Sequence, residues 1–335
     1  MARFLAVGFL SVLAFFVAHA DEPEVQSVDY PAVAAAINQT MLAHHYDPAE
    51  LKTAGYLRIE AAVVALAKTA ESNEAFIEGF REIWRNGPFS HVELRAAQGT
   101  ADDLAAHLDT LHIGGGGAVL TWEGDVAILT VNTMMGLDTI EEIDAAYVAI
   151  TEKGASRLII DLRENGGGAF AVRPLVGHLI DEPFDAGSFV SQRWNATGHR
   201  APNAADLEAL DPWEGWSIRA FWADVQEEPV TKISFAPLEP IFRGPVYVLT
   251  SERTASAAEL ATDAIKTSAR GKIIGENTAG QMLSQKIFDV PGGFHLSLPV
   301  ADYYSARNGR IEGVGVMPDI EVDASEALNV ALRQE

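Results

Sequence analysis

The spacing of hydrophobic residues along the chain changes at a run of glycines, Gly114–Gly117. Ahead of this run, from Tyr30 to about Leu94, apolar side chains recur every three or four positions, which is typical of amphipathic helices. The clearest helix spans Glu71–Trp84, where Ser72 or Asn73 can cap the first turn. The pattern therefore predicts a small helical region in the N-terminal part of the chain.

After the glycines, short apolar runs alternate with helical patterns. The run Leu158–Leu162 is apolar almost throughout, as expected for a strand buried on both faces. The alternation predicts an α/β fold with mainly parallel central strands, followed by antiparallel additions. The predicted central strands are Ala118–Trp122, Val126–Val131, Leu158–Leu162, Val246–Thr250 and Lys272–Glu276. The predicted helices are Asp138–Lys153 and two others that begin near Val172 and Ser256, and the additions are Lys286–Val290, Phe294–Leu298 and Val300–Tyr304.

One stretch, about residues 193–240, interrupts this alternation, and we predict irregular structure there. It is rich in tryptophan, with Trp194, Trp213, Trp216 and Trp222. A long loop in a compact domain is often functional, but its aromatic side chains can also serve only to pack against the core. The sequence leaves both interpretations open.

The first twenty residues have the features of a secretory signal peptide. Arg3 precedes an apolar run, Phe4–Val17, that is too short to span a membrane, and Ala18-His19-Ala20 forms a cleavage pattern. We therefore expect cleavage after Ala20 and a secreted, periplasmic protein that is not inserted in the membrane. The predicted division is a signal peptide at 1–20, a helical N-terminal domain at 21–112 and a core domain at 113–335.

Composition narrows the chemistry. The chain contains no Cys, which rules out a cysteine nucleophile and thiolate metal sites. The formal net charge of −23 disfavours binding to nucleic acid or to anionic lipid. The patterns H-E-x-x-H and G-x-S-x-G are also absent, so neither a zinc hydrolase nor an α/β-hydrolase is indicated. We predict no cofactor and no metal; the sequence does not indicate an oligomeric state.

Ser256 lies where a buried strand, Val246–Thr250, leads into a helix. A hydroxyl at this junction lies near free backbone N–H groups, which favour negative charge and can stabilise an oxyanion during acyl transfer. However, Ser256-Ala257-Ala258-Glu259 also matches the Ser-x-x-Glu capping box. The segment thus predicts either a nucleophile or a simple helix cap.

Three further segments carry candidate chemistry. Gly166–Gly168 follow a strand and allow close approach of the backbone to a ligand, although they could also form an ordinary tight turn. His91 follows Ser90, whereas His44-His45 has no metal-ligand spacing and is interpreted as the surface of a helix end. Glu312 precedes a glycine-rich segment.

Together these segments resemble peptidase family S41, which includes the carboxy-terminal processing (tail-specific) proteases, the tricorn core protease and the retinoid-binding modules of the interphotoreceptor matrix. The resemblance extends over Ala118–Asp323 and rests on motifs that occur in the family's order. These motifs are D-L-R-x-N-G-G-G at Asp161–Gly168, L-T-S-x-x-T-A-S-A-A-E at Leu249–Glu259, G-E-x-T-A-G at Gly275–Gly280 and G-V-G-V-x-P-D-I at Gly313–Ile320. The resemblance implies a crotonase-like αβ core.

The resemblance also implies a catalytic apparatus. The processing-protease branch uses a Lys as base, but the corresponding position here is Gln281, and residues 95–117 leave no room for that branch's PDZ domain. The tricorn-like branch uses a Ser-His pair and a Glu, which match Ser90, His91 and Glu312. By resemblance, Ser256 is the nucleophile and His91 the base, held by Ser90 and Glu312.

The resemblance places the oxyanion hole at the N–H of Ala257 and an N–H of the Gly166–Gly167 turn. If His91 is the base, its ordinary pKa predicts that activity is lost on acidification through about pH 6–7. The function expected is an exported serine peptidase acting on peptides or unfolded proteins.

Two other functions stay open. The first is an esterase or a non-proteolytic module that binds a hydrophobic ligand, with the Trp-rich region lining its pocket. The second is a crotonase-like acyl-CoA enzyme, which export disfavours because acyl-CoA is cytoplasmic.

Overall fold

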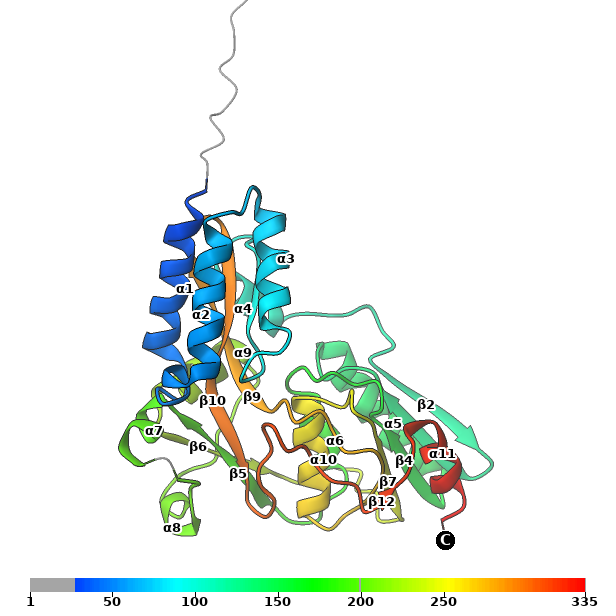
Figure 1. Ribbon diagram of the computed structural model, residues 1–335. Helices are drawn as coiled ribbons and strands as arrows, with labels where there is room; N and C mark the ends of the chain where they lie inside the picture. Colours follow the sequence, from blue (N-terminus) through cyan, green and yellow to red (C-terminus); the bar gives the residue numbers. More distant parts are fainter. Residues whose placement is uncertain (1–27, 199, 335) are drawn as a thin grey trace, which may run out of the picture.

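The computed structural model describes residues 28–198 and 200–334 (Figure 1). The predicted signal peptide lies outside these residues. The chain forms two six-stranded sheets, one mainly parallel and one antiparallel, with helices packed against each. The predicted mixed α/β class is confirmed.

Three helices form the N-terminal region, at the upper left of Figure 1. Each begins at a residue whose side chain accepts a hydrogen bond from the first turn, as the N-cap rule requires, and Ser72 is the cap of the third. The helices are α1 (Tyr30–His44), α2 (Ala54–Ala67) and α3 (Asn73–Trp84), with a short 3₁₀ turn η1 at Glu50–Lys52. A strand β1 (Glu93–Ala96) and a helix α4 (Ala101–Asp109) then lead to the first strand of the parallel sheet.

The mainly parallel sheet has the strand order β12-β8-β7-β4-β3-β2, and all neighbours are parallel except β2 and β3. Its strands are β2 (Ala118–Glu123), β3 (Val126–Val131), β4 (Arg157–Asp161), β7 (Val246–Thr250), β8 (Lys272–Gly275) and β12 (Ile320–Glu321). The predicted bounds of β3 and β7 match these strands, because continuous apolar runs between turn residues mark them clearly.

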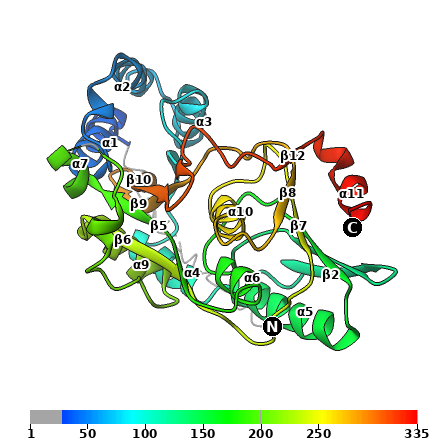
Figure 2. The same cartoon turned by 90° about the horizontal axis from the view of Figure 1, so that it is seen from below.

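Helices cover both faces of this sheet, as Figure 2 shows from below. On one face lie α5 (Leu137–Lys153), α6 (Val172–Gly177) and α10 (Ala257–Thr267), and on the other lies α11 (Ala324–Leu332). In β4, Leu158 and Ile160 pack against the first group and Ile159 against α11, and all three are fully buried. This two-sided burial explains why the β4 sequence is apolar without alternation.

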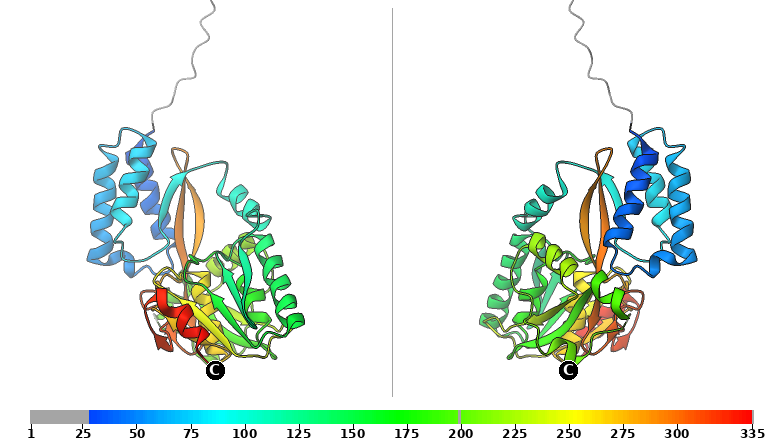
Figure 3. Two further views of the ribbon diagram at one scale, coloured as in Figure 1. Left: turned by 90° about the vertical axis from the view of Figure 1, so that its right-hand side faces the viewer. Right: turned by 90° about the vertical axis from the view of Figure 1, so that its left-hand side faces the viewer.

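The antiparallel sheet is built around one long strand, β10 (Phe294–Ser305), with the order β1-β10-β5-β6 and with β9 and β11 also paired to β10. The other strands are β5 (Phe184–Ser191), β6 (Val230–Phe235), β9 (Leu283–Val290) and β11 (Gly309–Arg310). Helices α1–α3 stand beside the β9–β10 ribbon (Figure 3) and share a core with it. In this sheet β1 comes from before residue 112 and the other strands come from after it. The predicted domain division at residue 112 stays a prediction.

Two predictions made from the sequence are wrong. The two strands proposed at Phe294–Leu298 and Val300–Tyr304 are one strand, whose register to β9 shifts between Pro299 and Ala301. The stretch proposed as irregular contains α7 (Gln192–Gly198), α8 (Ala204–Leu207), α9 (Ile218–Glu227) and β6. These helices are short, and β6 pairs with β5 far away in the sequence, so local periodicity gives little sign of them.

Candidate active site

Ser256 occupies the junction between β7 and α10 and has a backbone φ of 55°. A positive φ is uncommon for a residue with a side chain and is maintained only by its surroundings. Here the Ser256 N–H donates to the Gln281 carbonyl (3.0 Å) and to Oε2 of Glu259 (3.1 Å). The backbone of the candidate nucleophile is therefore clamped from two sides.

His91 meets Ser256 from the loop that follows α3. Its Nε2 lies 3.3 Å from Oγ of Ser256. His91 also has a positive φ, 62°, and among the described non-glycine residues only Ala269 shares this feature with His91 and Ser256. Two of these three strained positions thus face each other, which is the clustering expected of a functional site.

Ser90 and Glu312 complete a chain of hydrogen bonds behind His91. Oγ of Ser90 lies 2.7 Å from Nδ1 of His91 and donates to Oε2 of Glu312 at 3.1 Å. Glu312, only 6% exposed, also accepts from the backbone N–H of Ser90 (3.1 Å) and of Met282 (2.7 Å). Because the Ser90 hydroxyl donates its proton to the hydrogen bond with Glu312, its oxygen must accept from Nδ1 of His91. Nδ1 is then the protonated nitrogen, which leaves Nε2 free to accept the Ser256 proton.

Burial shifts the pKa values of His91 and Glu312. The surrounding protein lowers the pKa of His91 to about 4, so its imidazole is neutral at neutral pH and available as a base. Burial raises the pKa of Glu312, while its hydrogen bonds from Ser90 and Met282 oppose that shift. The loss of activity at pH 6–7 expected from an ordinary histidine therefore moves to about pH 4.

The glycine turn after β4 packs directly against Ser256. Gly167 has a φ of +100°, and a β-carbon there would lie 2.7 Å from Cβ of Ser256 and 3.1 Å from the backbone N of Ala257. Its N–H donates to Oδ1 of Asn165 (2.8 Å), so the Gly167 amide predicted as an oxyanion donor is already engaged. Gly166, Gly168 and Ala257 line the cavity in front of Ser256.

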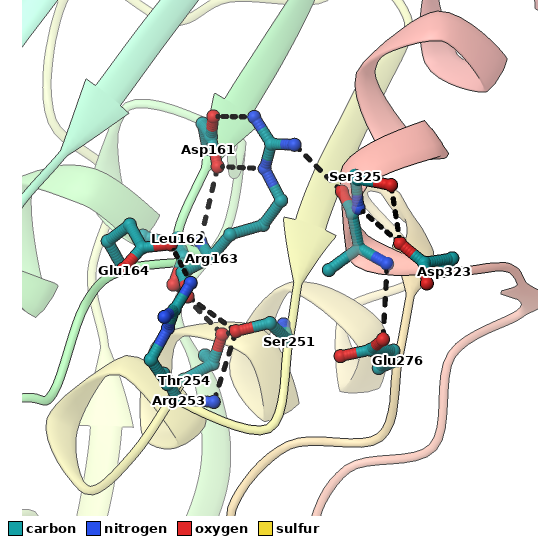
Figure 4. A network of polar contacts seen from close by, with 11 residues as sticks. Asp161, Leu162, Arg163, Glu164, Ser251, Arg253, Thr254, Glu276, Asp323 and Ser325 are labelled. Carbon is teal, nitrogen blue, oxygen red and sulfur yellow. Dashed lines mark hydrogen bonds and ion pairs between the residues drawn. The ribbon is translucent and has the colours of Figure 1, made fainter.

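The turns after β4 and β7 are tied together by short polar side chains (Figure 4). Oγ1 of Thr254 donates to the Leu162 carbonyl (2.8 Å), and the hydroxyl of Ser251 donates to the Arg163 carbonyl. The Ala255 N–H donates to the Asn165 carbonyl (3.0 Å). These contacts give Ser251 and Thr254 of the L-T-S-x-x-T-A-S segment a structural role.

Arg163 extends this network to the far face of the sheet. Its guanidinium binds both carboxylate oxygens of Asp161 (2.9 and 2.7 Å) and donates to the Ala324 carbonyl at the start of α11 (2.8 Å; Figure 4). The D-L-R motif therefore anchors the glycine turn to the C-terminal helix.

Glu259 has a larger part than the capping box predicts. It is fully buried, and besides Ser256 it accepts from Oγ1 of Thr278 (2.6 Å) and from the N–H groups of Gly280 and Gln281 (2.8 Å each). One carboxylate thus holds both Ser256 and the Gly275–Gly280 loop, whereas the capping-box spacing predicted only the contact with Ser256.

A cavity of about 460 Å³ opens in front of Ser256 and His91. Its walls are mainly aromatic and aliphatic, and α9 and β6 of the Trp-rich stretch contribute to them. The aromatic side chains that line it are Phe170, Phe189, Trp213, Phe221, Trp222 and Phe235. The sequence left open that the Trp-rich stretch lines a pocket, and four of these residues come from that stretch; Phe170 and Phe189 were not singled out.

Three other residues considered from the sequence, His44, His45 and Gln281, lie outside the series of side-chain hydrogen bonds from Glu312 to Ser256. His45 is fully buried against Phe89, with ring centroids 4.2 Å apart, so the interpretation as surface is wrong for His45. His44 is the last residue of α1, is half-buried and accepts from Gln226 (2.8 Å). The side chain of Gln281 is exposed. Over residues 28–198 and 200–334, no group of three or more His, Cys, Asp or Glu side chains could hold a metal ion. No helix within these ranges is long and apolar enough to cross a membrane.

Comparison with known proteins finds similarity to peptidases. The model of peptidase family S41 matches residues 125–322, more than half of the chain. A chloroplastic C-terminal processing peptidase of Tetradesmus obliquus is 28% identical over 207 residues, which cover 62% of this chain and 36% of that protein. The chain thus matches little more than a third of that relative's length.

Two solved structures are similar in fold. A candidate peptidase from Parabacteroides merdae has a TM-score of 0.60 at 14% identity and covers 89% of this chain and 90% of its own. The photosystem II D1 C-terminal processing protease has a TM-score of 0.53 at 15% identity, covering 92% and 98%. On the match of the family model, the chain belongs to peptidase family S41.

Proposed function

We propose that this chain is an exported serine peptidase that hydrolyses peptide bonds through an acyl-enzyme on Ser256. The observation that carries the proposal is the unbroken series of hydrogen bonds from Glu312 through Ser90 and His91 to Ser256. A nucleophile, a base and groups that orient the base are the elements that acyl transfer requires.

In the proposed reaction, Nε2 of His91 takes the proton of the Ser256 hydroxyl as Oγ attacks the scissile carbonyl carbon. His91 then donates this proton to the leaving amine, and the acyl group stays on Ser256. In the second half, His91 deprotonates a water molecule, which attacks the acyl carbon and releases the free acid. Ser90 keeps the His91 ring in one orientation, and the Glu312 carboxylate stabilises the transient positive charge through the Ser90 hydroxyl.

The negative oxygen of each tetrahedral intermediate needs fixed donors. We assign one to the N–H of Ala257, which is the first residue of α10 and lies at the positive end of the helix dipole. The other is the N–H of Gly166 or Gly168, both of which line the cavity. Gly167 instead contributes its lack of a side chain, which lets the turn approach Ser256.

The replacement of a lysine base by Gln281 supports His91 as the base. An amide cannot take a proton from Ser256, and the Gln281 side chain is exposed. In the Ser256 clamp this residue contributes only backbone groups, its carbonyl to Ser256 and its N–H to Glu259.

The apolar cavity favours substrates with bulky apolar groups near the bond that is cut. We propose peptides or unfolded proteins as substrates. The protein would meet them after its export and the cleavage of its signal peptide. The same walls would also suit an apolar ester, or a hydrophobic ligand that is bound without being cut.

One experiment separates these functions. The protein without residues 1–20 and its Ser256→Ala variant are incubated with a mixed peptide pool and with p-nitrophenyl esters of increasing chain length, and products are identified by mass spectrometry. Cleavage of peptides by the wild type only supports the peptidase. Ester cleavage without peptide cleavage would favour an esterase, and inactivity of both folded proteins would favour a binding module.

A further inference from the structure

The wall of the Ser256 cavity contains a cation that forms no ion pair. Arg173, in the first turn of α6, lines the cavity and is half-buried. No ion pair joins it to a carboxylate anywhere in the described part of the chain. Glu214, whose negative charge favours the charged form of Arg173, is exposed and lies beyond ion-pair distance.

Aromatic rings hold this guanidinium in place. Its central carbon lies 5.0 Å from the ring centre of Trp216, 5.3 Å from that of Trp213 and 5.9 Å from that of Phe170. One hydrogen bond, from Nη2 to the Trp213 carbonyl (3.1 Å), fixes its orientation. Five N–H donors on a stacked, planar group leave several donors without a partner, a geometry that a lysine could not reproduce.

The other arginine of the cavity differs. Arg95 also lines the wall, but its Nη2 is bonded to Glu93 at 2.6 Å. Of these two cations, Arg173 alone can offer an uncompensated positive charge to a ligand. A partly desolvated guanidinium in an apolar wall is costly without a counter-charge, and a carboxylate that enters the cavity would supply one.

We propose that Arg173 forms a carboxylate subsite, which selects substrates that carry a carboxylate next to apolar groups. This inference rests on the proposed function, because the subsite acts in the cavity where Ser256 attacks. The carboxylate can be the C-terminal carboxylate of a peptide or the side chain of an Asp or Glu. A volume of about 460 Å³ suits a short apolar segment whose charged end reaches Arg173.

The test uses three N-acetylated leucine tripeptides: the free acid, the C-terminal amide, and an amide with one leucine replaced by glutamate. We measure kcat and KM for the wild type, for Arg173→Gln and for the control Arg243→Gln, which changes an exposed arginine paired with Asp181 and outside the cavity lining. For the free acid or for the glutamate peptide, Arg173→Gln should raise KM about 10- to 100-fold with little change in kcat, as expected for loss of a charged hydrogen-bonded pair. The leucine amide should be hydrolysed equally by the wild type and Arg173→Gln, and Arg243→Gln should behave as the wild type on all three peptides.

The pattern among the peptides identifies the source of the carboxylate. A large effect confined to the free acid assigns the subsite to chain ends, and an effect confined to the glutamate peptide assigns it to acidic side chains. An equal loss on all three peptides would overturn the proposal, because Arg173 would then act only on the shape of the cavity. So would equal KM values for all three in the wild type.

Binding separates this inference from the proposed function. Calorimetric titration of Ser256→Ala with the three peptides needs no turnover. If the wild type cuts none of them, tighter binding of a carboxylate peptide that disappears in Ser256→Ala/Arg173→Gln still supports the subsite. Equal binding of all three peptides would refute it.

Discussion

Gly167 and Ser256 touch so closely that no side chain fits between them: a β-carbon on Gly167 would lie 2.7 Å from Cβ of Ser256. The turn that follows β4 and the turn that carries Ser256 therefore position one another. Both turns extend from parallel neighbouring strands, whose carboxyl ends meet at one edge of the sheet, where active sites of such sheets are found.

Replacing Gly167 by Ala should displace this contact. The added carbon would meet Ser256 and the Ala255 carbonyl below 3 Å, at a φ of +100°. We expect a loss of about 1–3 kcal/mol in unfolding free energy from backbone strain. We also expect a fall in kcat of about 10²-fold, because small misplacements of a nucleophile are costly.

Gly116→Ala is the matched control, measured in the same activity assay and urea titration. Gly116 also has a positive φ (+81°), but a β-carbon there meets no atom within 4 Å. It should reproduce the strain without the loss of activity. Equal activity of the two variants would contradict a specific contact between Gly167 and Ser256.

The Glu312–Ser90 pair should act through the orientation of His91. Glu312→Gln keeps the shape but cannot accept from all three of its donors, so kcat should fall by about 10²–10⁴-fold, the range attributed to a positioned base. Ser90→Ala removes two hydrogen bonds, the one to the Glu312 carboxylate and the one with Nδ1 of His91, and should cost about 10- to 100-fold. Steady-state kinetics checks both, with KM expected to change little.

Non-additivity makes this prediction sharper. If Ser90 relays the effect of Glu312, the double variant should be about as slow as Glu312→Gln. Multiplied losses in the double variant would show that the two residues act independently and would argue against a relay.

The pH profile should report the burial of His91. Since burial lowers its pKa to about 4, the neutral base persists well below neutral pH. We expect kcat/KM to stay level on acidification from about pH 8 to about pH 5 and to fall by half near pH 4. A midpoint at pH 6–7 would mean that His91 is solvated or is not the base.

The same shift predicts how stability depends on pH. Between the ordinary value of 6.5 and about 4, the unfolded chain binds a proton at His91 that the folded chain does not. The contribution of His91 is therefore fully present above pH 6.5 and is lost as the pH falls toward 4. Urea titrations should show that the wild type loses more stability than His91→Gln between pH 7.5 and pH 4.5, and parallel losses would contradict this.

Glu259 should be essential for the geometry of the Ser256 turn. Its carboxylate accepts from Ser256, Thr278, Gly280 and Gln281, and a glutamine presents only one acceptor oxygen. Glu259→Gln should lower the unfolding free energy by about 1–3 kcal/mol and reduce kcat. Glu252→Gln, at an exposed position in the preceding turn, serves as control and should change neither quantity.

The Ser256 turn and the glycine turn were foreseeable from local sequence because both follow buried strands, whereas His91, Ser90 and Glu312 were assigned from the family resemblance. The apolar runs of β3, β4 and β7 mark buried strands, and the glycines and serines after them mark the turns that carry chemistry. The candidates Ser256, His91, Ser90 and Glu312 do lie within hydrogen-bonding distance of one another in series.

The features that local sequence did not reveal are those made by contacts between residues far apart in the chain. The pairing of β5 with β6 and the aromatic cavity join segments far apart in the chain, so no periodicity announces them. The resemblance placed an oxyanion donor in the Gly166–Gly167 turn, but a sequence cannot show that the Gly167 N–H is engaged by Asn165, because that contact is a matter of three-dimensional geometry.

The most direct test of the central claim is the reactivity of Ser256 itself. The wild type, Ser256→Ala and His91→Ala are treated with a fluorophosphonate probe, and the labelled peptide is mapped by mass spectrometry. We predict labelling of the wild type at Ser256 only, none in Ser256→Ala, and labelling slowed by about 10²-fold or more in His91→Ala. Labelling of the wild type elsewhere, or an unchanged rate in His91→Ala, would contradict a Ser256 nucleophile activated by His91.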